Sequence, residues 1–416
     1  MGLQLCQLCE IAYFVTDKIP LEKVLLTDYV TTDSLLPNKE GRCVAQNLPP
    51  QKCALTHYKC GDVLVANIRP YLKKIWFADR EGGASADVLV FRAKSGHSQE
   101  FLYASLLQDT FYDYVMKGKK GSKMPRGDKA QIMRYSIPKL SLAEEACIGN
   151  IILSFCTKVN VNRLINDNLE AMAKQLYDYW FVQFDFPNEE GKPYKSSGGA
   201  MVWNEKLKRE IPVGWSVKNI GQIATSYQQG LIRSNNQLST DSKYGYLKMG
   251  DLDGKGQYTL QGLTRTNATN EEVDLYSLHK GDFLINVRNS KEIVGKTCLI
   301  GYVERNTLYN HMLVRLDFKD VSTFYMNLLF NSEFMYKALD GLKQGTTTVI
   351  ALYQSDLYRL PILIPAPCVM ERFLKITDSI LDQKEIISHE IAELTKQRNE
   401  LLPLLMNGQA TVNYHL

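Results

Sequence analysis

A dense run of positive charge stands in residues 117–129, which read KGKKGSKMPRGDK. Six lysines and arginines occur there against a single Asp128, and the glycines between them allow close approach of the backbone to a partner. Cations at this density neutralise phosphates, an attraction that weakens as salt rises. The run therefore predicts a phosphate-contacting loop, although a solvated surface loop has the same composition.

Two arginines stand where predicted strands end. Arg69 closes the phrase GDVLVANIRP, and Arg288 follows GDFLINV in a second, closely similar phrase. A guanidinium at such a position can read guanine in the major groove or hold a phosphate. A structural salt bridge is the alternative interpretation of both residues.

Residues 226–251, SYQQGLIRSNNQLSTDSKYGYLKMGD, form a long polar segment with adenine-reading side chains. Asn and Gln are suited to reading adenine, and they are also ordinary loop residues. Near the end of the chain, KQGTTT from Lys343 offers hydroxyl groups in place of charge, which can contact phosphate or base edges.

No arrangement of residues points to catalysis by this chain. The phosphate-binding pattern G-x-x-x-x-G-K-[ST] does not occur, and none of the six histidines belongs to H-E-x-x-H. Cys6 and Cys9 form a lone C-x-x-C, whereas a zinc site would need a second pair or histidines at matching spacing. We expect no catalytic residue and no bound metal.

Bulk composition predicts a cytoplasmic protein away from membranes. The nine cysteines lack the even spacing of a disulfide framework, which favours a reducing compartment. No apolar run approaches the roughly 20 residues that a bilayer span requires. Lys and Arg exceed Asp and Glu by 20 to 14 in residues 1–140 and by 19 to 16 in residues 201–366.

The elements that would position these residues occur twice in the same order. GDVLVANIRP begins at Gly61 and GDFLINVRNS at Gly281. Each is followed by a short apolar strand, an aromatic helix (101–115 or 324–339), a small polar loop, a strand ending in proline and a long helix. The second copy opens with IPVGWSVKNIGQIA, and IAYFVTDKIPLEKV stands in that place in the first. The chain is therefore predicted to be an internal duplication.

Both copies end in a helix of about 40 residues with a coiled-coil stripe. The first is predicted from Ser141 to about Phe181, with polar layers at Asn162 and Asn166 that would pair and fix register. The second is predicted from about Cys368 to Leu405. Its stripe consists of Phe373, Ile376, Ile380, Ile387, Ile391, Leu394, Leu401 and Leu405. We expect the helices to pack against each other antiparallel; an ordinary interdomain bundle is the alternative.

Residues 168–223 and 393–409 resemble the specificity subunits of type I restriction-modification systems. IPVGW followed by a short strand is similar to the usual opening of a target recognition domain in that family, and GDFLINVR resembles its following strand. The resemblance extends over essentially the whole chain and over the order of its parts.

The resemblance implies an α/β fold with two target recognition domains, residues 1–140 and 201–366. A central spacer helix and linker (141–200) and a C-terminal spacer helix (367–416) would form an antiparallel coiled coil, giving a pseudo-two-fold repeat. Such a chain recognises a split, asymmetric target in double-stranded DNA and has no catalytic activity or cofactor of its own. The residues expected to contact DNA are Arg69, Lys73, Lys74, Lys119, Lys120, Lys123, Arg126, Arg233, Lys243, Tyr244, Lys248, Arg288, Lys291, Lys343, Thr346 and Thr347.

The resemblance also implies partner subunits. Two modification (methyltransferase) subunits would hold S-adenosylmethionine and methylate adenine. Restriction subunits, with endonuclease and translocase activity, would use ATP and Mg. Two rivals remain open at this point: a coiled-coil scaffold whose end domains bind proteins, and an enzyme that acts alone.

Overall fold

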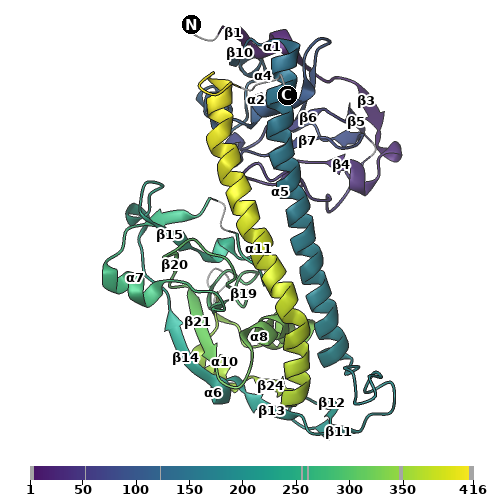
Figure 1. Ribbon diagram of the computed structural model, residues 1–416, viewed down its shortest axis with the longest axis vertical. Coiled ribbons are helices and arrows are strands. Elements are labelled where there is room, and N and C mark those ends of the chain that lie inside the picture. Colours follow the sequence, from purple (N-terminus) through teal and green to yellow (C-terminus); the bar gives the residue numbers. More distant parts are fainter. Residues whose placement is uncertain are drawn as a thin grey trace. The chain divides into compact units, whose positions relative to one another are not determined.

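The computed structural model describes residues 4–51, 53–121, 123–253, 256–259, 262–345 and 350–411. The chain forms two compact units: unit 1 comprises Met1–Leu164 and Glu390–Leu416, and unit 2 comprises Ile165–His389. Two long helices, α5 (Leu142–Tyr177) and α11 (Pro367–Met406), each contribute residues to both units (Figure 1).

Unit 1 is built on a four-stranded antiparallel sheet in the order β2-β9-β6-β7. Its strands are Ala12–Phe14, Val88–Ala93, Val63–Ala66 and Ile75–Phe77. A second sheet has the order β3-β5-β8-β4, in which only β4 runs parallel to its neighbour. Its strands are Lys18–Pro20, Ala54–Tyr58, Gly82–Ala84 and Tyr29–Val30. A third pair joins β1 (Leu5–Gln7) to β10 (Ser136–Pro138).

Unit 2 repeats this plan with a four-stranded antiparallel sheet in the order β14-β21-β17-β19. Its strands are Ala224–Gln229, Leu313–Phe318, Phe283–Asn286 and Thr297–Leu299. The accompanying sheet β16-β15-β20 again ends in a parallel strand; its strands are Thr264–Thr266, Tyr244–Leu247 and Leu308–Tyr309. The counterpart of the third pair is β13 (Ser216–Asn219) with β24 (Pro361–Ile364). Unit 2 adds the hairpin β11–β12 (Met201–Asn204, Arg209–Pro212).

The matching strand orders confirm the duplication and correct the predicted opening of the first copy. In unit 1 the short helix α1 (Leu8–Ile11) links β1 to β2, as α6 (Ile220–Ile223) links β13 to β14 in unit 2. Each helix begins with the same capping contact between the residue before the helix and the third residue of the helix. The Gln7 N–H donates to the Glu10 side chain, and the Asn219 N–H donates to the Gln222 side chain, both at 2.7 Å. Strand β1 and helix α1 (residues 5–11) are therefore the counterparts of β13 and α6 (residues 216–223), and they begin upstream of the segment from Ile11 that was predicted.

Each predicted aromatic helix is two helices, so the expectation of one continuous helix is wrong. In unit 1, α2 (Gln99–Leu107) stops at Gln108, whose extended backbone (ψ 144°) cannot continue the helix before α3 (Asp109–Lys117). In unit 2, α8 (Thr323–Phe330) and α9 (Glu333–Asp340) are separated in the same way, and Ser332 caps α9 by accepting from the Met335 N–H. Short helices α4 (Lys129–Ile132), α7 (Asn270–Tyr276) and α10 (Gln354–Arg359) complete the two units.

The two long helices are present close to their predicted bounds, and they run antiparallel in each unit. In unit 1, Asn162 Nδ2 donates to Glu390 Oε2 (2.9 Å), and Cys156 lies near Arg398. In unit 2, Asn166 Nδ2 donates to Ser388 Oγ at 3.2 Å. Asn162 and Asn166 therefore each have a polar partner on α11, but the partners are a carboxylate and a hydroxyl and not the amides that were predicted.

One predicted stripe position is wrong, and one helix end is irregular. Ile376 is 46% exposed and lies outside the buried stripe. The chain after Tyr177 continues as a single π-helical turn, Asp178–Val182, whose Trp180 and Phe181 are buried with Phe373 and Trp215 in the core of unit 2. None of the described helices has the length and apolar character that a membrane crossing requires.

The repeated Gly-Asp opens the central strand of each four-stranded sheet and carries a buried ion pair. Gly61 and Gly281 have φ of 88° and 92°, a conformation that favours glycine. In unit 1, Asp62 accepts from the Lys59 N–H (2.7 Å) and binds the Arg92 guanidinium through two bonds of 2.7 Å. Asp62 is 1% exposed.

The same arrangement recurs in unit 2. Asp282 accepts from the His279 N–H at 2.9 Å and from Arg315 Nη1 at 3.1 Å. Arg92 lies on β9 and Arg315 on β21, the neighbours of β6 and β17. The aspartate therefore joins the turn and two adjacent strands at one point. The sequence pattern predicted the turn but not its arginine partner.

Replacing Asp62 by Asn should destabilise unit 1, because the largely buried Arg92 guanidinium loses the carboxylate that binds it through two hydrogen bonds. We expect Asp62→Asn to lower the free energy of unfolding by about 3 kcal/mol, measured as a shift of the urea midpoint. Asp79→Asn is the matched control, since Asp79 pairs with Arg80 at 2.7 Å but its side chain is 61% exposed. Equal midpoints for the two variants would contradict the assigned role of Asp62.

Candidate nucleic-acid interface

One edge of the unit 1 sheet brings Arg69 and the basic loop together. Arg69 follows β6, adopts a left-handed backbone (φ 52°) and donates its N–H to the Pro125 carbonyl at 2.8 Å. Lys120 and Arg126 exchange backbone hydrogen bonds of 2.8 and 2.9 Å, and Arg126 also forms a bridge with Ile68. The loop is thus a small hairpin laid against the Arg69 turn, although some 50 residues separate the two in sequence.

Some basic side chains at this edge are paired with a carboxylate of the protein, and others are not. Arg69, Lys119 and Lys123 are exposed, and no ion pair holds their side chains within the described part of the chain. Lys120 binds Asp128 (2.5 Å) and Arg126 binds Asp87 (3.0 Å), but both basic side chains stay more than half exposed. Hydrogen bonds from Lys120 and the Gln131 N–H lower the pKa of Asp128 to about 2. Exposed ion pairs of this kind contribute little to folding stability, so the lysine or arginine can exchange its carboxylate partner for a phosphate.

Two other predicted cations are engaged inside unit 1. Lys73 Nζ donates to Asp109 Oδ1 at 2.7 Å, and Lys74 Nζ donates to the Thr32 carbonyl at 2.5 Å. Burial lowers the pKa of Lys74. These two side chains hold the turn after Arg69 in place, and they are less available to a polyanion than the sequence predicted.

Unit 2 places Arg288 at the equivalent edge. Arg288 is exposed in β18 (Arg288–Asn289), which pairs with β23 (Ile350–Ala351), and β23 pairs with β22 (Gln344–Gly345). Burial and the nearby Arg288 charge lower the pKa of His311, whose N–H donates to the Leu231 carbonyl at 3.1 Å. His311, which lies just before β21, is thus close to Arg288 and bonded to the segment that follows β14. Thr346 and Thr347 lie outside the described residues.

Two lysines of unit 2 lie beside this hairpin in different surroundings. Lys343 is nearly enclosed: its side chain is 8% exposed, and Nζ contacts the Lys291 carbonyl (3.0 Å) and Asp340 (3.2 Å). Lys291 is 64% exposed and lies 3.7 Å from Asp340. Of the two, Lys291 is the one presented to solvent.

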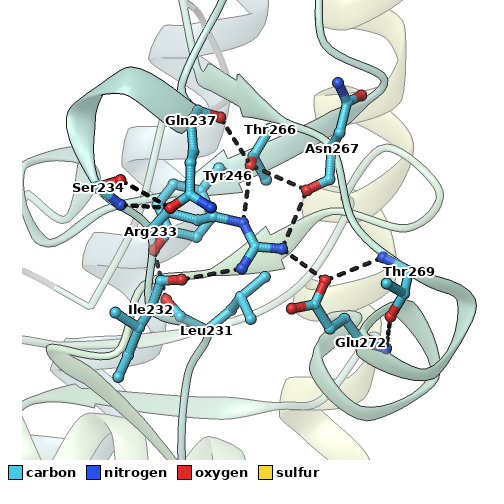
Figure 2. A network of polar contacts seen from close by, with 10 residues as sticks. All are labelled: Leu231, Ile232, Arg233, Ser234, Gln237, Tyr246, Thr266, Asn267, Thr269 and Glu272. Carbon is cyan, nitrogen blue, oxygen red and sulfur yellow. Dashed lines mark hydrogen bonds and ion pairs between the residues drawn. The ribbon is translucent and has the colours of Figure 1, made fainter.

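Arg233 is surrounded by protein acceptors, as Figure 2 shows. Its guanidinium donates to Thr266 Oγ1 (3.2 Å), to the Ile232 and Asn267 carbonyls (3.0 and 3.1 Å), and to Glu272 Oε2 (2.6 Å). The side chain is 9% exposed. This network joins the segment after β14 to β16 and to the start of α7, so Arg233 has the surroundings of a structural residue.

The rest of the polar segment is partly folded into unit 2. Tyr244 is buried in β15, and Lys243 Nζ lies 4.9 Å from its ring centroid. The Lys248 N–H donates to Asp251 at 2.7 Å. Next to Arg233, the side chain of Ile232 is 70% exposed, a feature that the sequence analysis did not single out. Within the described residues no group of His, Cys, Asp or Glu is arranged to hold a metal ion.

Residues 212–396 match a family model described as the type I restriction modification DNA specificity domain. The chain is 24% identical over 330 residues to the type I restriction enzyme MjaIX specificity subunit of Methanocaldococcus jannaschii, covering 77% of this chain and 71% of that protein. It is 23% identical over 440 residues to the type I restriction enzyme HindI specificity subunit of Haemophilus influenzae, covering 92% and 94%.

A solved type I restriction-modification system S subunit from M. genitalium aligns with 98% of this chain and 96% of its own, with a TM-score of 0.49 and 11% identity. Over residues 212–396 the chain therefore matches the DNA specificity domain of type I restriction-modification systems, and over most of its length it is similar to the specificity subunits of two such enzymes.

Proposed function

We propose that this chain binds double-stranded DNA at a split, asymmetric target, with each unit reading one half-site. The observation that carries the proposal is the repeated edge: in both units an exposed arginine follows the central strand and lies against a hairpin from a later segment. Exposed cations at such an edge suit phosphate contacts, and a guanidinium there suits guanine.

The sheet edges at Arg69 and Arg288 have the same backbone arrangement but present different side chains. The hairpin of unit 1 offers lysines and an arginine, whereas β22 of unit 2 offers Gln344 and Gly345. Different donors and acceptors read different base edges. Two unlike half-sites follow from this difference, which makes the target asymmetric.

The finer architecture belongs to the same proposal. Residues 1–140 and 201–366 act as target recognition domains, and residues 141–200 and 367–416 form an antiparallel coiled coil that sets the gap between the half-sites. Support comes from the antiparallel contacts within each unit, such as Asn162 with Glu390 and Asn166 with Ser388. Polar pairs of this kind fix register in helix pairs.

The chain acts in the cytoplasm with partners that do the chemistry. Two modification subunits supply S-adenosylmethionine and methylate adenine in the bound target. Restriction subunits supply endonuclease and translocase activity with ATP and Mg. Both named relatives are specificity subunits of type I restriction enzymes, which supports this assignment.

The decisive experiment maps methylated adenines by long-read sequencing in cells that express the chain with its modification partner. The expected result is one bipartite motif with two unlike half-sites and a gap of constant length. A scaffold that binds only proteins predicts no such motif and no duplex binding by the purified chain. Methylation or cleavage by the chain alone would instead favour an independent enzyme.

Removing the two unpaired lysines of the unit 1 hairpin should weaken binding in a salt-dependent way. We expect Lys119→Ala combined with Lys123→Ala to reduce the slope of log affinity against log salt by up to about 2, because each lost phosphate contact removes about 0.9. Fluorescence anisotropy with a target duplex at several salt concentrations measures this slope.

The matched control is Lys59→Ala with Lys94→Ala, which removes the same charge from unit 1. Lys59 precedes β6 and Lys94 follows β9, so both lie at the opposite ends of these strands from Arg69. Equal slopes for the two double variants would place the hairpin on a solvated face.

Arg288 and Arg233 should respond oppositely to substitution. We expect Arg288→Ala to weaken target binding by about 1–3 kcal/mol with an unchanged melting temperature, because the side chain is exposed. We expect Arg233→Ala to lower the melting temperature, because the buried Thr266 and the partly exposed Glu272 lose their donor. Calorimetry and anisotropy on both variants measure the two effects, and a stable Arg233→Ala chain with weakened binding would reverse the assignment.

A further inference from the structure

A short loop of unit 1, residues 38–42, lies between the turn that follows Arg69 and helix α5. Two backbone hydrogen bonds join the loop to that turn: the Asn38 N–H donates to the Leu72 carbonyl and the Lys39 N–H to the Lys73 carbonyl, both at 2.9 Å. These contacts link segments some 34 residues apart in sequence. The loop is therefore a direct neighbour of the candidate interface.

Backbone strain is concentrated at this junction. Eight non-glycine residues in the described chain have positive φ, and four of them meet here: Asn38 (55°), Lys39 (65°), Arg69 (52°) and Lys73 (51°). Residues with side chains hold such conformations only where the surrounding structure enforces them, and they cluster at functional sites. The loop and the turn thus constrain each other.

Asp109 joins the loop to the turn by charge. Its Oδ1 accepts from Lys39 Nζ at 2.9 Å and from Lys73 Nζ at 2.7 Å. The Lys39 side chain is 8% exposed. Burial acts to raise the pKa of Asp109, but the hydrogen bonds from the two lysines outweigh it and lower that pKa, so the carboxylate stays ionised. One anion therefore holds a lysine from each segment.

The other side of the loop is tied to α5. Arg163 Nη2 lies 3.3 Å from Glu40 Oε1, and Arg163 Nη1 donates to the Glu40 carbonyl at 3.3 Å. Both side chains are about three-quarters buried, with exposures of 24% and 23%. At Gly41 (φ 81°) an added Cβ would lie 3.8 Å from the Asn160 side chain, so the loop backbone itself lies against α5. The links run without interruption from α5 through residues 38–42 to the Arg69 turn.

We propose that residues 38–42 act as a strut that fixes the Arg69–Lys74 turn to a set point on α5, with Glu40, Arg163 and Asp109 as positioning residues. The inference deepens the proposed function and rests on it. Helix α5 carries the chain from unit 1 into unit 2. A turn held firmly on that helix reads the first half-site at a defined position, so the strut sharpens the choice of gap length between half-sites.

The test uses the full chain assembled with its modification subunits and duplexes whose gap is the preferred length or one base pair longer or shorter. Arg163→Gln removes the charged link between the strut and α5, and Arg163→Lys keeps the charge. Lys174→Gln is the control, because Lys174 lies on the same helix and pairs with the nearby Asp178 (2.6 Å) but touches neither the strut nor α11 through an ion pair among the described residues. Hydrogen exchange of the Asn38 and Lys39 amides reports the strut directly.

We expect Arg163→Gln to speed exchange at these two amides and to reduce the affinity ratio between the preferred and altered gaps by about fivefold or more. Base preference in the second half-site should stay unchanged. Arg163→Lys should keep most of the ratio, and Lys174→Gln all of it. If Arg163→Gln fails to fold, Asp109→Asn tests the other end of the strut with the same readouts.

Two results would overturn the inference while leaving the proposed function intact. One is an unchanged gap ratio in a well-folded Arg163→Gln complex. The other is an equal loss of affinity for every gap length, which describes a residue that serves stability alone. A wild-type complex that shows no preference for any gap length would contradict both the proposed function and the proposed role of residues 38–42.

Discussion

Both units depend on one constraint, the ion pair at the start of the central strand. Its aspartate is buried in unit 1 and largely buried in unit 2, where the Asp282 side chain is 14% exposed. In unit 1 the Asp62 carboxylate satisfies a turn N–H and a guanidinium on the adjacent strand at once, and Asp282 does the same in unit 2. Burying a carboxylate is costly unless it is paired and hydrogen-bonded, so the turn, the arginine and the strand register must form together. With one end of the strand fixed in this way, its other end presents Arg69 or Arg288 at a reproducible place.

The two ends of the central strand have different roles, which explains how one fold can recognise two different DNA sequences. The aspartate end is buried and repeated, whereas the arginine end meets a hairpin whose side chains differ between the units. Changes in the hairpin leave the ion pair untouched. Sequence preference can therefore diverge between the units without loss of the fold that supports it.

Basic side chains in the candidate interface fall into two groups that composition alone does not separate. Arg233, Lys74 and Lys343 donate to acceptors supplied by distant segments, such as Glu272, the Thr32 carbonyl and the Lys291 carbonyl. Arg69, Lys119 and Arg288 remain exposed. A cation that is enclosed by protein acceptors stabilises the fold. Only the exposed cations can exchange their bound water for a phosphate at a low cost in free energy.

The sequence by itself determined the duplication, the two long helices and the positions of the basic loop and the strand-end arginines. These features are local: a repeated order of elements, a four-three apolar spacing and a turn that needs Gly61 or Gly281 can all be read along the chain. It also indicated that Asn162 and Asn166 need polar partners, although those partners proved to be Glu390 and Ser388 and not amides. Tertiary structure alone decided that Arg92 completes the Gly-Asp turn, that Arg233 is enclosed, and that residues 38–42 join the Arg69 turn to α5. Each of these depends on acceptors far away in sequence, whose approach is set by packing and strand register and not by any local pattern.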